Sequence, residues 1–216
     1  MMELSAIKIK IIKIFIAVFY LVGVIGIVLP ITQELFISIF PVAILLSFFL
    51  LMLDYNKQGS KALIIFFGII TSSIIIEAIG VKTGILFGNY RYGSALGLEI
   101  AETPLLIGVN WLVLSYCSVS IVQQFKISNS IKYLFAPMLM VIYDVVMEQV
   151  ASTLDMWYWQ DDVIPLQNYL GWFVIASLFT SILLGFKVNA INRIAKYIYI
   201  VQFVFFLSLH LIFNVL

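Results

Sequence analysis

Residues 61–80 read KALIIFFGIITSSIIIEAIG, a run that is apolar almost throughout and carries one acid, Glu77, near its end. A helix of about 20 such residues crosses the hydrocarbon core of a bilayer. Six further stretches have similar length and composition: 9–30, 34–53, 104–124, 132–152, 165–186 and 194–215. The sequence therefore predicts an all-α fold, a polytopic membrane helix bundle with about seven transmembrane helices.

The composition agrees with this prediction. Of the 216 residues, 63% are apolar and 11% are charged, whereas soluble domains have about 25% charged residues. We expect residues 1–216 to form a single integral membrane domain. One cysteine and one histidine make a cysteine- or histidine-bound metal site improbable. The net charge of +1 and the lack of a basic run give no sign of nucleic-acid binding, and we expect neither a metal nor another cofactor.

Lysine and arginine predict the orientation. Ten cations lie at the amino terminus or in the second, fourth and sixth loops, against two, Lys82 and Arg91, in the loops between them. The ten are Lys8, Lys10, Lys13, Lys57, Lys61, Lys126, Lys132, Lys187, Arg193 and Lys196. Cytoplasmic loops carry such an excess. We therefore expect a cytoplasmic N-terminus and an outside C-terminus, with both long loops, 81–103 and 153–164, on the outer side.

Three acids within or beside the predicted spans are candidate catalytic residues. Asp144 and Glu148 are four residues apart and therefore share one helical face, and Glu77 lies near the outer end of its helix. Ionisable groups inside membranes are costly and are often functional. A buried pair of carboxyls tends to keep one proton, which suits a general acid. The alternative is that these acids only hydrogen-bond to backbone or amides and orient the helices.

Amide and aromatic side chains near these acids are further candidates. Asn110 and Asn168 could position water or a carboxyl, or could only join helices. Trp157, Trp159 and Trp172 could form part of a site, or of the aromatic belt at the membrane interface. Three glycines spaced by four, Gly80, Gly84 and Gly88, predict a close-packed loop rather than a dimer interface.

Four segments together resemble a known family, the membrane-embedded carotenoid biosynthesis proteins, which include γ-carotene and bisanhydrobacterioruberin hydratases. In order, they are EAIGVKTGILFGNYRYG at 77–93, PLLIGVNW at 104–111, DVVME at 144–148, and WYW at 157–159 with PLQNYLGW at 165–172. The resemblance covers about residues 70–185. Gln149 and Leu98 stand where the family pattern has proline.

The resemblance implies a carotenoid hydratase, a hydro-lyase that adds water to the terminal C=C of an acyclic carotenoid end and gives a tertiary alcohol. Such a reaction needs an acid, stabilisation of a tertiary cation and a positioned water, but no cofactor. The Asp144/Glu148 pair would supply the acid, and Asn168 or Glu77 would hold the water. The candidate substrate-binding residues are Tyr90, Tyr92, Asn110, Trp111, Trp157, Trp159, Asn168 and Trp172.

The expected partners are a carotenoid within the lipid bilayer and water, with other membrane enzymes of the pathway as further candidates. The expected location is a bacterial inner (cell) membrane. Two other functions remain open from the residues alone. One is a small proton-coupled or lipid-like transporter that uses the acids as a relay. The other is a non-catalytic carotenoid-binding subunit, whose pigment binding would survive loss of Asp144 and Glu148.

Overall fold

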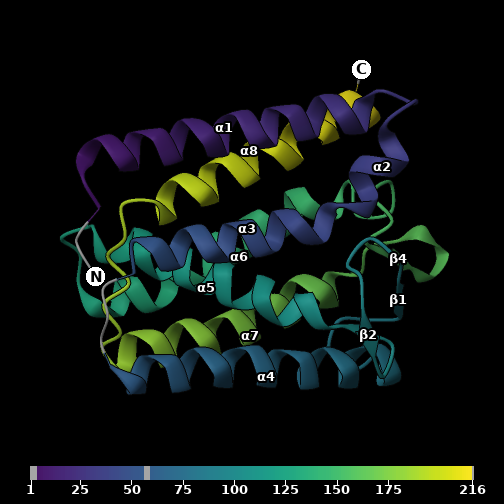
Figure 1. The fold of residues 1–216 in the computed structure, drawn as a ribbon. Coiled ribbons are helices and arrows are strands. Elements are labelled where there is room, and N and C mark those ends of the chain that lie inside the picture. The colour runs from purple at the N-terminus through teal and green to yellow at the C-terminus, as the bar shows by residue number, and fades with distance from the viewer. Residues whose placement is uncertain (1–3, 56–58, 216) are drawn as a thin grey trace.

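The computed structural model describes residues 4–55 and 59–215 and is 71% helical. Six of its helices are long and apolar enough to cross a membrane. They are α1 (Ala6–Val28), α4 (Ser60–Thr83), α5 (Leu105–Gln123), α6 (Asn129–Glu148), α7 (Leu166–Gly185) and α8 (Ala195–Asn214). They run side by side. Helices α1 and α4 point the same way, and from α4 to α8 successive helices alternate in direction, so that α1 begins at one end of the bundle and α8 finishes at the other (Figure 1). The predicted all-α polytopic bundle is confirmed.

The second predicted span, 34–53, is not one continuous helix. It is divided into α2 (Gln33–Ser38) and α3 (Phe40–Leu53), with Pro41 in the first turn of α3. Proline has no N–H to donate and its ring clashes with a preceding helical turn, so it is tolerated at the beginning of a helix and breaks its interior. At 14 residues, α3 is shorter than the six long helices, and it returns the chain through the bundle between α1 and α4 (Figure 1).

The helix with the acid pair is shifted from the prediction of 132–152. It begins at Asn129, because the Ser128 hydroxyl accepts a hydrogen bond from the Ile131 N–H and caps it. It ends at Glu148, which therefore lies in the last turn and next to the following loop.

Helix α5 lies at the centre of the bundle, and most of its residues are buried. The surrounding helices instead expose large apolar side chains, for example Phe67 at 71% and Ile64 at 69% on α4 and Val174 at 66% on α7. Water would not tolerate apolar surface of this extent, whereas lipid tails solvate it. The chain is a membrane protein.

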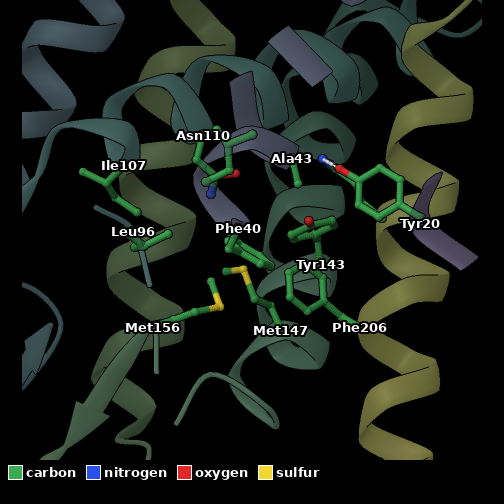
Figure 2. Close-up of a pocket in the computed structure, with 12 residues that line it drawn as sticks. Tyr20, Phe40, Ala43, Leu96, Ile107, Asn110, Tyr143, Met147, Met156 and Phe206 are labelled. Carbon is green, nitrogen blue, oxygen red and sulfur yellow. Dashed lines mark hydrogen bonds between the residues drawn. The ribbon is translucent and has the colours of Figure 1, made fainter. Parts of the chain in front are cut away.

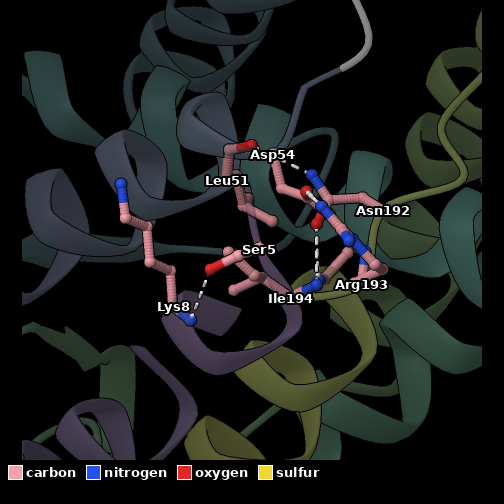
Figure 3. A network of polar contacts seen from close by, with 8 residues as sticks. Ser5, Lys8, Leu51, Asp54, Asn192, Arg193 and Ile194 are labelled. Carbon is pink, nitrogen blue, oxygen red and sulfur yellow. Dashed lines mark hydrogen bonds and ion pairs between the residues drawn. The ribbon is translucent and has the colours of Figure 1, made fainter. Parts of the chain in front are cut away.

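At the end of the bundle where α1 and α8 begin, polar contacts join the end of α3 to the beginning of α8 (Figure 3). The Arg193 guanidinium pairs with Asp54 at 2.5 Å. The Asn192 amide donates to the Leu51 carbonyl at 2.9 Å, while its oxygen accepts the Ile194 N–H and so caps the beginning of α8. Nine of the ten cations that are predicted to be cytoplasmic lie at this end, and the tenth, Lys57, lies outside the described residues.

Short strands lie at the opposite end, in the two long loops. Strand β1 (Tyr90–Tyr92) pairs antiparallel with β4 (Trp157–Trp159), which leads into the 3₁₀ helix η1 (Gln160–Asp162). Strands β2 (Glu99–Ile100) and β3 (Thr103–Pro104) form a hairpin directly before α5. The β1/β4 pair joins the two long loops directly over the ends of α4, α6 and α7 (Figure 1).

Candidate functional site

Glu77, in the last two turns of α4, is buried and held by three donors. The hydroxyls of Tyr90 and Tyr92 donate to Oε2 at 2.6 and 2.8 Å, and the Trp111 indole N–H donates to Oε1 at 2.8 Å. A carboxylate offers about four lone-pair positions to donors. Three of the four on Glu77 are therefore filled, and Oε1 keeps one.

Glu148, at the end of α6, has a matching arrangement. The indole N–H groups of Trp157 and Trp159 donate to Oε2 at 3.0 and 2.7 Å. The Asn168 amide donates to Oε1 at 3.1 Å. Here too one acceptor position remains on Oε1, and the side chain is only 5% exposed.

Asp144 lies one helical turn before Glu148 and is fully buried. The same Asn168 amide donates to its Oδ2 at 3.0 Å and so bridges the two acids. Its Oδ1 has no hydrogen-bond partner among the described residues. A buried carboxylate oxygen without a donor is costly, which makes this oxygen a natural place for a proton shared within the pair.

The β1/β4 pair explains how four of these donors reach the acids. Its register places Tyr90 opposite Trp159 and Tyr92 opposite Trp157. Alternate residues of a strand point to one face, so all four rings face the bundle. The residues between them, Arg91 and Tyr158, face away from it, and the guanidinium lies 4.5 Å from the centre of the Tyr158 ring.

Charge and burial keep the two tyrosines in their donor form. Burial, followed by the charge of Glu77, raises the pKa of Tyr90 and of Tyr92 above the ordinary value. Both hydroxyls therefore stay protonated at neutral pH and donate to Glu77.

A small cavity separates the two glutamates. Glu77 and Glu148 both line it, and aromatic rings make up much of the remaining wall. These rings belong to Phe87, Tyr90, Tyr92, Trp157, Trp159 and Trp172. Behind the cavity wall, Trp111 stacks on Trp172 with ring centres 4.3 Å apart. The arrangement combines two carboxyls with electron-rich ring faces, which attract cations.

The family model described as carotenoid biosynthesis protein matches residues 34–216. The chain belongs to this family. No curated protein and no solved structure matches it.

In this carotenoid biosynthesis protein, most of the predicted site residues lie together. The candidate acids Glu77 and Glu148 face the cavity, and Asp144 lies behind Glu148, joined to it by Asn168. The other predicted residues that line the cavity are Tyr90, Tyr92, Trp157, Trp159, Asn168 and Trp172. Trp111 contributes through its hydrogen bond to Glu77. The four segments that carry the resemblance thus meet at one end of the carotenoid biosynthesis protein.

Asn110 is the exception among the predicted residues. It follows Val109 on α5 and lines a different cavity, away from the two glutamates. The neighbouring Trp111 is rotated by about 100° around the helix, and this rotation separates the two side chains. Ile107 is common to the walls of both cavities.

Sequence reasoning missed Phe87 and Ile107 as wall residues. Phe87 lies between two glycines: a Cβ on Gly80 would be 2.7 Å from its ring, and a Cβ on Gly171 would be 3.0 Å from it. The expected close packing of this loop is therefore present, and small residues provide the space for the ring. The spacing of the glycines was the available signal, but it does not tell which side chain fills the space.

A second set of contacts holds the two long loops together on the outer face of the strands. The Ser94 hydroxyl and N–H donate to Asp155 Oδ2 at 2.5 and 3.0 Å, and the Tyr158 hydroxyl donates to Oδ1 at 2.8 Å. Partial burial acts to raise the pKa of Asp155, but these hydrogen bonds outweigh it and the pKa lies below the ordinary value. Asp155 therefore acts as an ionised link between the loops.

Proposed function

We propose that this protein is a cofactor-independent carotenoid hydratase, which adds water across the terminal C=C of an acyclic carotenoid end. The observation that carries the proposal is the cavity with Glu77 and Glu148 in its wall and aromatic rings around them. The family supports a role in carotenoid biosynthesis. Hydration of an isolated alkene needs an acid, a cation-stabilising surface and a water, and each has a candidate here.

Glu148 is the proposed proton donor. It lines the cavity, whereas Asp144 does not, and its Oε1 keeps one position that a proton can occupy. The proton passes to the terminal alkene carbon that carries fewer alkyl groups, and the π electrons form the new C–H bond. Asp144 shares the proton with Glu148 through their common link to Asn168 and restores it after each turnover.

The cation that forms is tertiary and lies among the rings of the cavity. Ring faces of Trp and Tyr stabilise cations by about 0.5–2 kcal/mol each, and the negative charge of Glu77 adds to this. Glu77 Oε1 has one acceptor position left, which can hold a water. The water oxygen then bonds to the cationic carbon and its proton passes to Glu77, so that H and OH have been added and no electrons have been transferred. Exchange with water at the end of the bundle returns both carboxyls to their starting charge.

The orientation, partners and location that the sequence predicts belong to this proposal. With the lysine-rich end in the cytoplasm, the acids lie at the outer interface, where water is available. The carotenoid enters from the bilayer, so that no soluble domain is needed. Other membrane enzymes of the pathway would supply the substrate, and a bacterial cell membrane is the proposed location.

The test is expression in a bacterium that makes lycopene and γ-carotene, followed by mass analysis of the extracted pigments. We expect products heavier by one water, or by two for lycopene hydrated at both ends. Glu148→Gln should lower product formation about 100-fold or more, as loss of a general acid does, and Asp144→Asn should lower it less. The matched control is Glu99→Gln, which makes the same change at an exposed position on β2.

The alternative functions are outcomes of the same experiment. Each variant is first checked for its amount in the membrane by immunoblot. Product that persists in both Glu77→Gln and Glu148→Gln would overturn the proposed mechanism. If pigment co-purifies with the protein but is chemically unchanged, the result would favour a non-catalytic carotenoid-binding subunit over an enzyme. If the protein neither converts nor binds pigment, the result would favour the transporter hypothesis.

A further inference from the structure

A cavity of about 510 Å³, here called the lysine cavity, lies at the end of the bundle where α1 and α8 begin, opposite to the two glutamates. It is enclosed by the end of α5, the beginning of α6 and the segment that joins α7 to α8. Ligand sites in proteins measure about 300–1,000 Å³. By contrast, the cavity around Asn110 and Met147, drawn in Figure 2, measures about 20 Å³ and has room for one water.

Two lysines place positive charge in the wall of the lysine cavity. Lys132 lies in the first turn of α6, and Lys187 follows the end of α7. Among the residues that the structure describes, no acid lines the cavity, and neither ammonium group has an ion pair or a hydrogen bond. Asp54, the acid described at this end, is already paired with Arg193. Cations that line one cleft raise the local concentration of anions, so the cavity is suited to a negatively charged group.

The backbone at Lys187 is unusual for a lysine, because its φ of +56° lies in the left-handed region. Its N–H donates to the Leu184 carbonyl at 3.0 Å, and the Val188 N–H donates to the Leu183 carbonyl at 2.9 Å. Helices that end with this pair of hydrogen bonds usually have glycine at the left-handed position. Residues other than glycine are strained there, and such strain is common where a side chain serves a ligand. Here it directs an ammonium group into the cavity wall.

The segment that carries Lys187 is held in place by α5. The Gln123 amide nitrogen donates to the Val188 carbonyl at 2.9 Å, and its oxygen accepts the Ala190 N–H at 2.9 Å. One side chain thus supplies both a donor and an acceptor to the backbone of this segment. A wall that is already ordered loses little conformational freedom when a ligand binds.

The rest of the wall suits a molecule that is polar at one end and apolar at the other. The Asn129 amide and the Tyr133 hydroxyl line the cavity and can donate to oxygen atoms. Leu184 and Ile191 line it as well, and Ile191 is 55% exposed. Because the cavity lies at the ends of helices long enough to span the bilayer, it is at the level of the lipid headgroups. Basic pockets between membrane helices bind anionic headgroups.

We propose that the lysine cavity binds the phosphate of an anionic phospholipid of the phosphatidylglycerol type. The phosphate lies between Lys132 and Lys187, and the glycerol hydroxyls of the headgroup bond to Asn129 and Tyr133. The acyl chains leave past Ile191 into the bilayer. Phosphatidylcholine has the same phosphate, but its own ammonium would add a third cation beside the two lysines. The site lies at the opposite end of the bundle from the two glutamates, so the proposal does not depend on the proposed hydration.

The first test is native mass spectrometry of the full chain in detergent, titrated with phosphatidylglycerol or with phosphatidylcholine that has the same acyl chains. We expect the first phosphatidylglycerol to bind at least about tenfold more tightly than the first phosphatidylcholine. Lys132→Gln and Lys187→Gln should each weaken the binding of phosphatidylglycerol about fivefold. The matched control is Lys126→Gln, which removes the same charge at an exposed position at the same end, outside the cavity wall. It should bind phosphatidylglycerol like the parent protein.

A second measurement distinguishes a lipid from a free phosphate and shows that the variants are folded. Phosphatidylglycerol should raise the melting temperature of the parent protein, but not that of the double variant Lys132→Gln/Lys187→Gln. Inorganic phosphate and glycerol 3-phosphate, at millimolar concentration, should leave the melting temperature of the parent unchanged. Equal stabilisation by these soluble phosphates would identify a free phosphate as the ligand and overturn the lipid site. Equal binding of the two lipids, or equal weakening by Lys126→Gln and Lys187→Gln, would show general charge attraction and overturn the proposal too.

Discussion

The two glutamates of the cavity are each fixed by three hydrogen bonds and keep one open acceptor position on Oε1. Hydrogen bonds to charged groups contribute about 1.5–3 kcal/mol each, so neither carboxyl is free to rotate. A fixed carboxyl with one open position is suited to holding one proton or one water at a defined place. The donors differ in kind, since two hydroxyls and an indole hold Glu77, whereas two indoles and an amide hold Glu148.

Asn168 is the residue on which both acids of α6 depend. Replacing it by leucine, Asn168→Leu, removes the sole protein donor to Asp144 among the described residues and one of the three donors to Glu148. We expect the free energy of unfolding to fall by about 1–3 kcal/mol, the cost of unpaired buried polar groups. Thermal unfolding in detergent measures the change. The control Asn129→Leu, at an exposed position at the beginning of α6, should have little effect, and equal melting temperatures for the two variants would contradict this account.

Asp155 predicts a pH dependence of the loops. Because its pKa in the folded protein lies below the value near 3.9 of the unfolded chain, its contribution to stability is present above about pH 4 and is lost as the pH falls through the folded pKa. Between pH 6 and 3, the melting temperature of the parent protein should fall more than that of Asp155→Asn. Parallel curves for the two proteins would show that Asp155 does not link the loops in this way.

At the scale of elements, the β1/β4 pair determines which side chains reach the acids. The change Tyr92→Phe keeps the ring and removes one donor to Glu77, whereas Tyr158→Phe makes the same change on the outer face. We expect a loss of about 1–3 kcal/mol for Tyr92→Phe and a change within about 0.5 kcal/mol for Tyr158→Phe. Pigment analysis of the same two variants should show lower product only for Tyr92→Phe. If both tyrosines behave alike, the register of the strand pair does not matter for the site.

The close contact between α7 and the loop after α4 predicts that alanine substitutions at two glycines, Gly171 and Gly68, have opposite effects on stability. A Cβ on Gly171 would lie 2.5 Å from the Leu86 carbonyl oxygen, a backbone atom that cannot move without the loop. Gly171→Ala should therefore destabilise the protein, displace Phe87 and lower activity. Gly68→Ala, in the interior of α4 with no atom within 4 Å of its Cβ, should stabilise the protein by about 0.5–1 kcal/mol because alanine favours helix. Melting temperatures of the two variants test both signs.

The helices were more predictable than the loops, for a physical reason. Apolar length alone identifies a membrane helix, so the seven stretches were found, although Pro41 divides the second and Ser128 shifts the beginning of α6. Pairing between the two long loops depends on contacts more than 60 residues apart in sequence, and the periodicity of three-residue strands is too short to reveal it. The acids were identifiable because charge is rare in these spans, but which donors hold them was not. Asn110 lines a different cavity from the acids, because adjacent helical residues point in different directions.

For the whole molecule, the charge asymmetry predicts that the acid site lies on the outer side of the membrane. Cys117 is fully buried, so cysteines introduced at exposed positions at the two ends can be labelled selectively. A membrane-impermeant maleimide should label Leu98→Cys in intact cells and Lys126→Cys only after permeabilisation. The reverse pattern would place the site in the cytoplasm and overturn the orientation.

The contacts of the two glutamates also have an order along the chain. Every group that holds Glu77 lies between Tyr90 and Trp111, on β1 or in the first two turns of α5. The groups that hold Glu148 are complete only with Asn168 on α7. Since a chain is synthesised from its N-terminus and folds as it emerges, the half of the site around Glu77 can assemble while α6 and α7 are still being made. Strand β1 can thus be held in place by its hydrogen bonds to Glu77 before β4 is synthesised. When β4 emerges, it pairs with a strand whose position is already fixed.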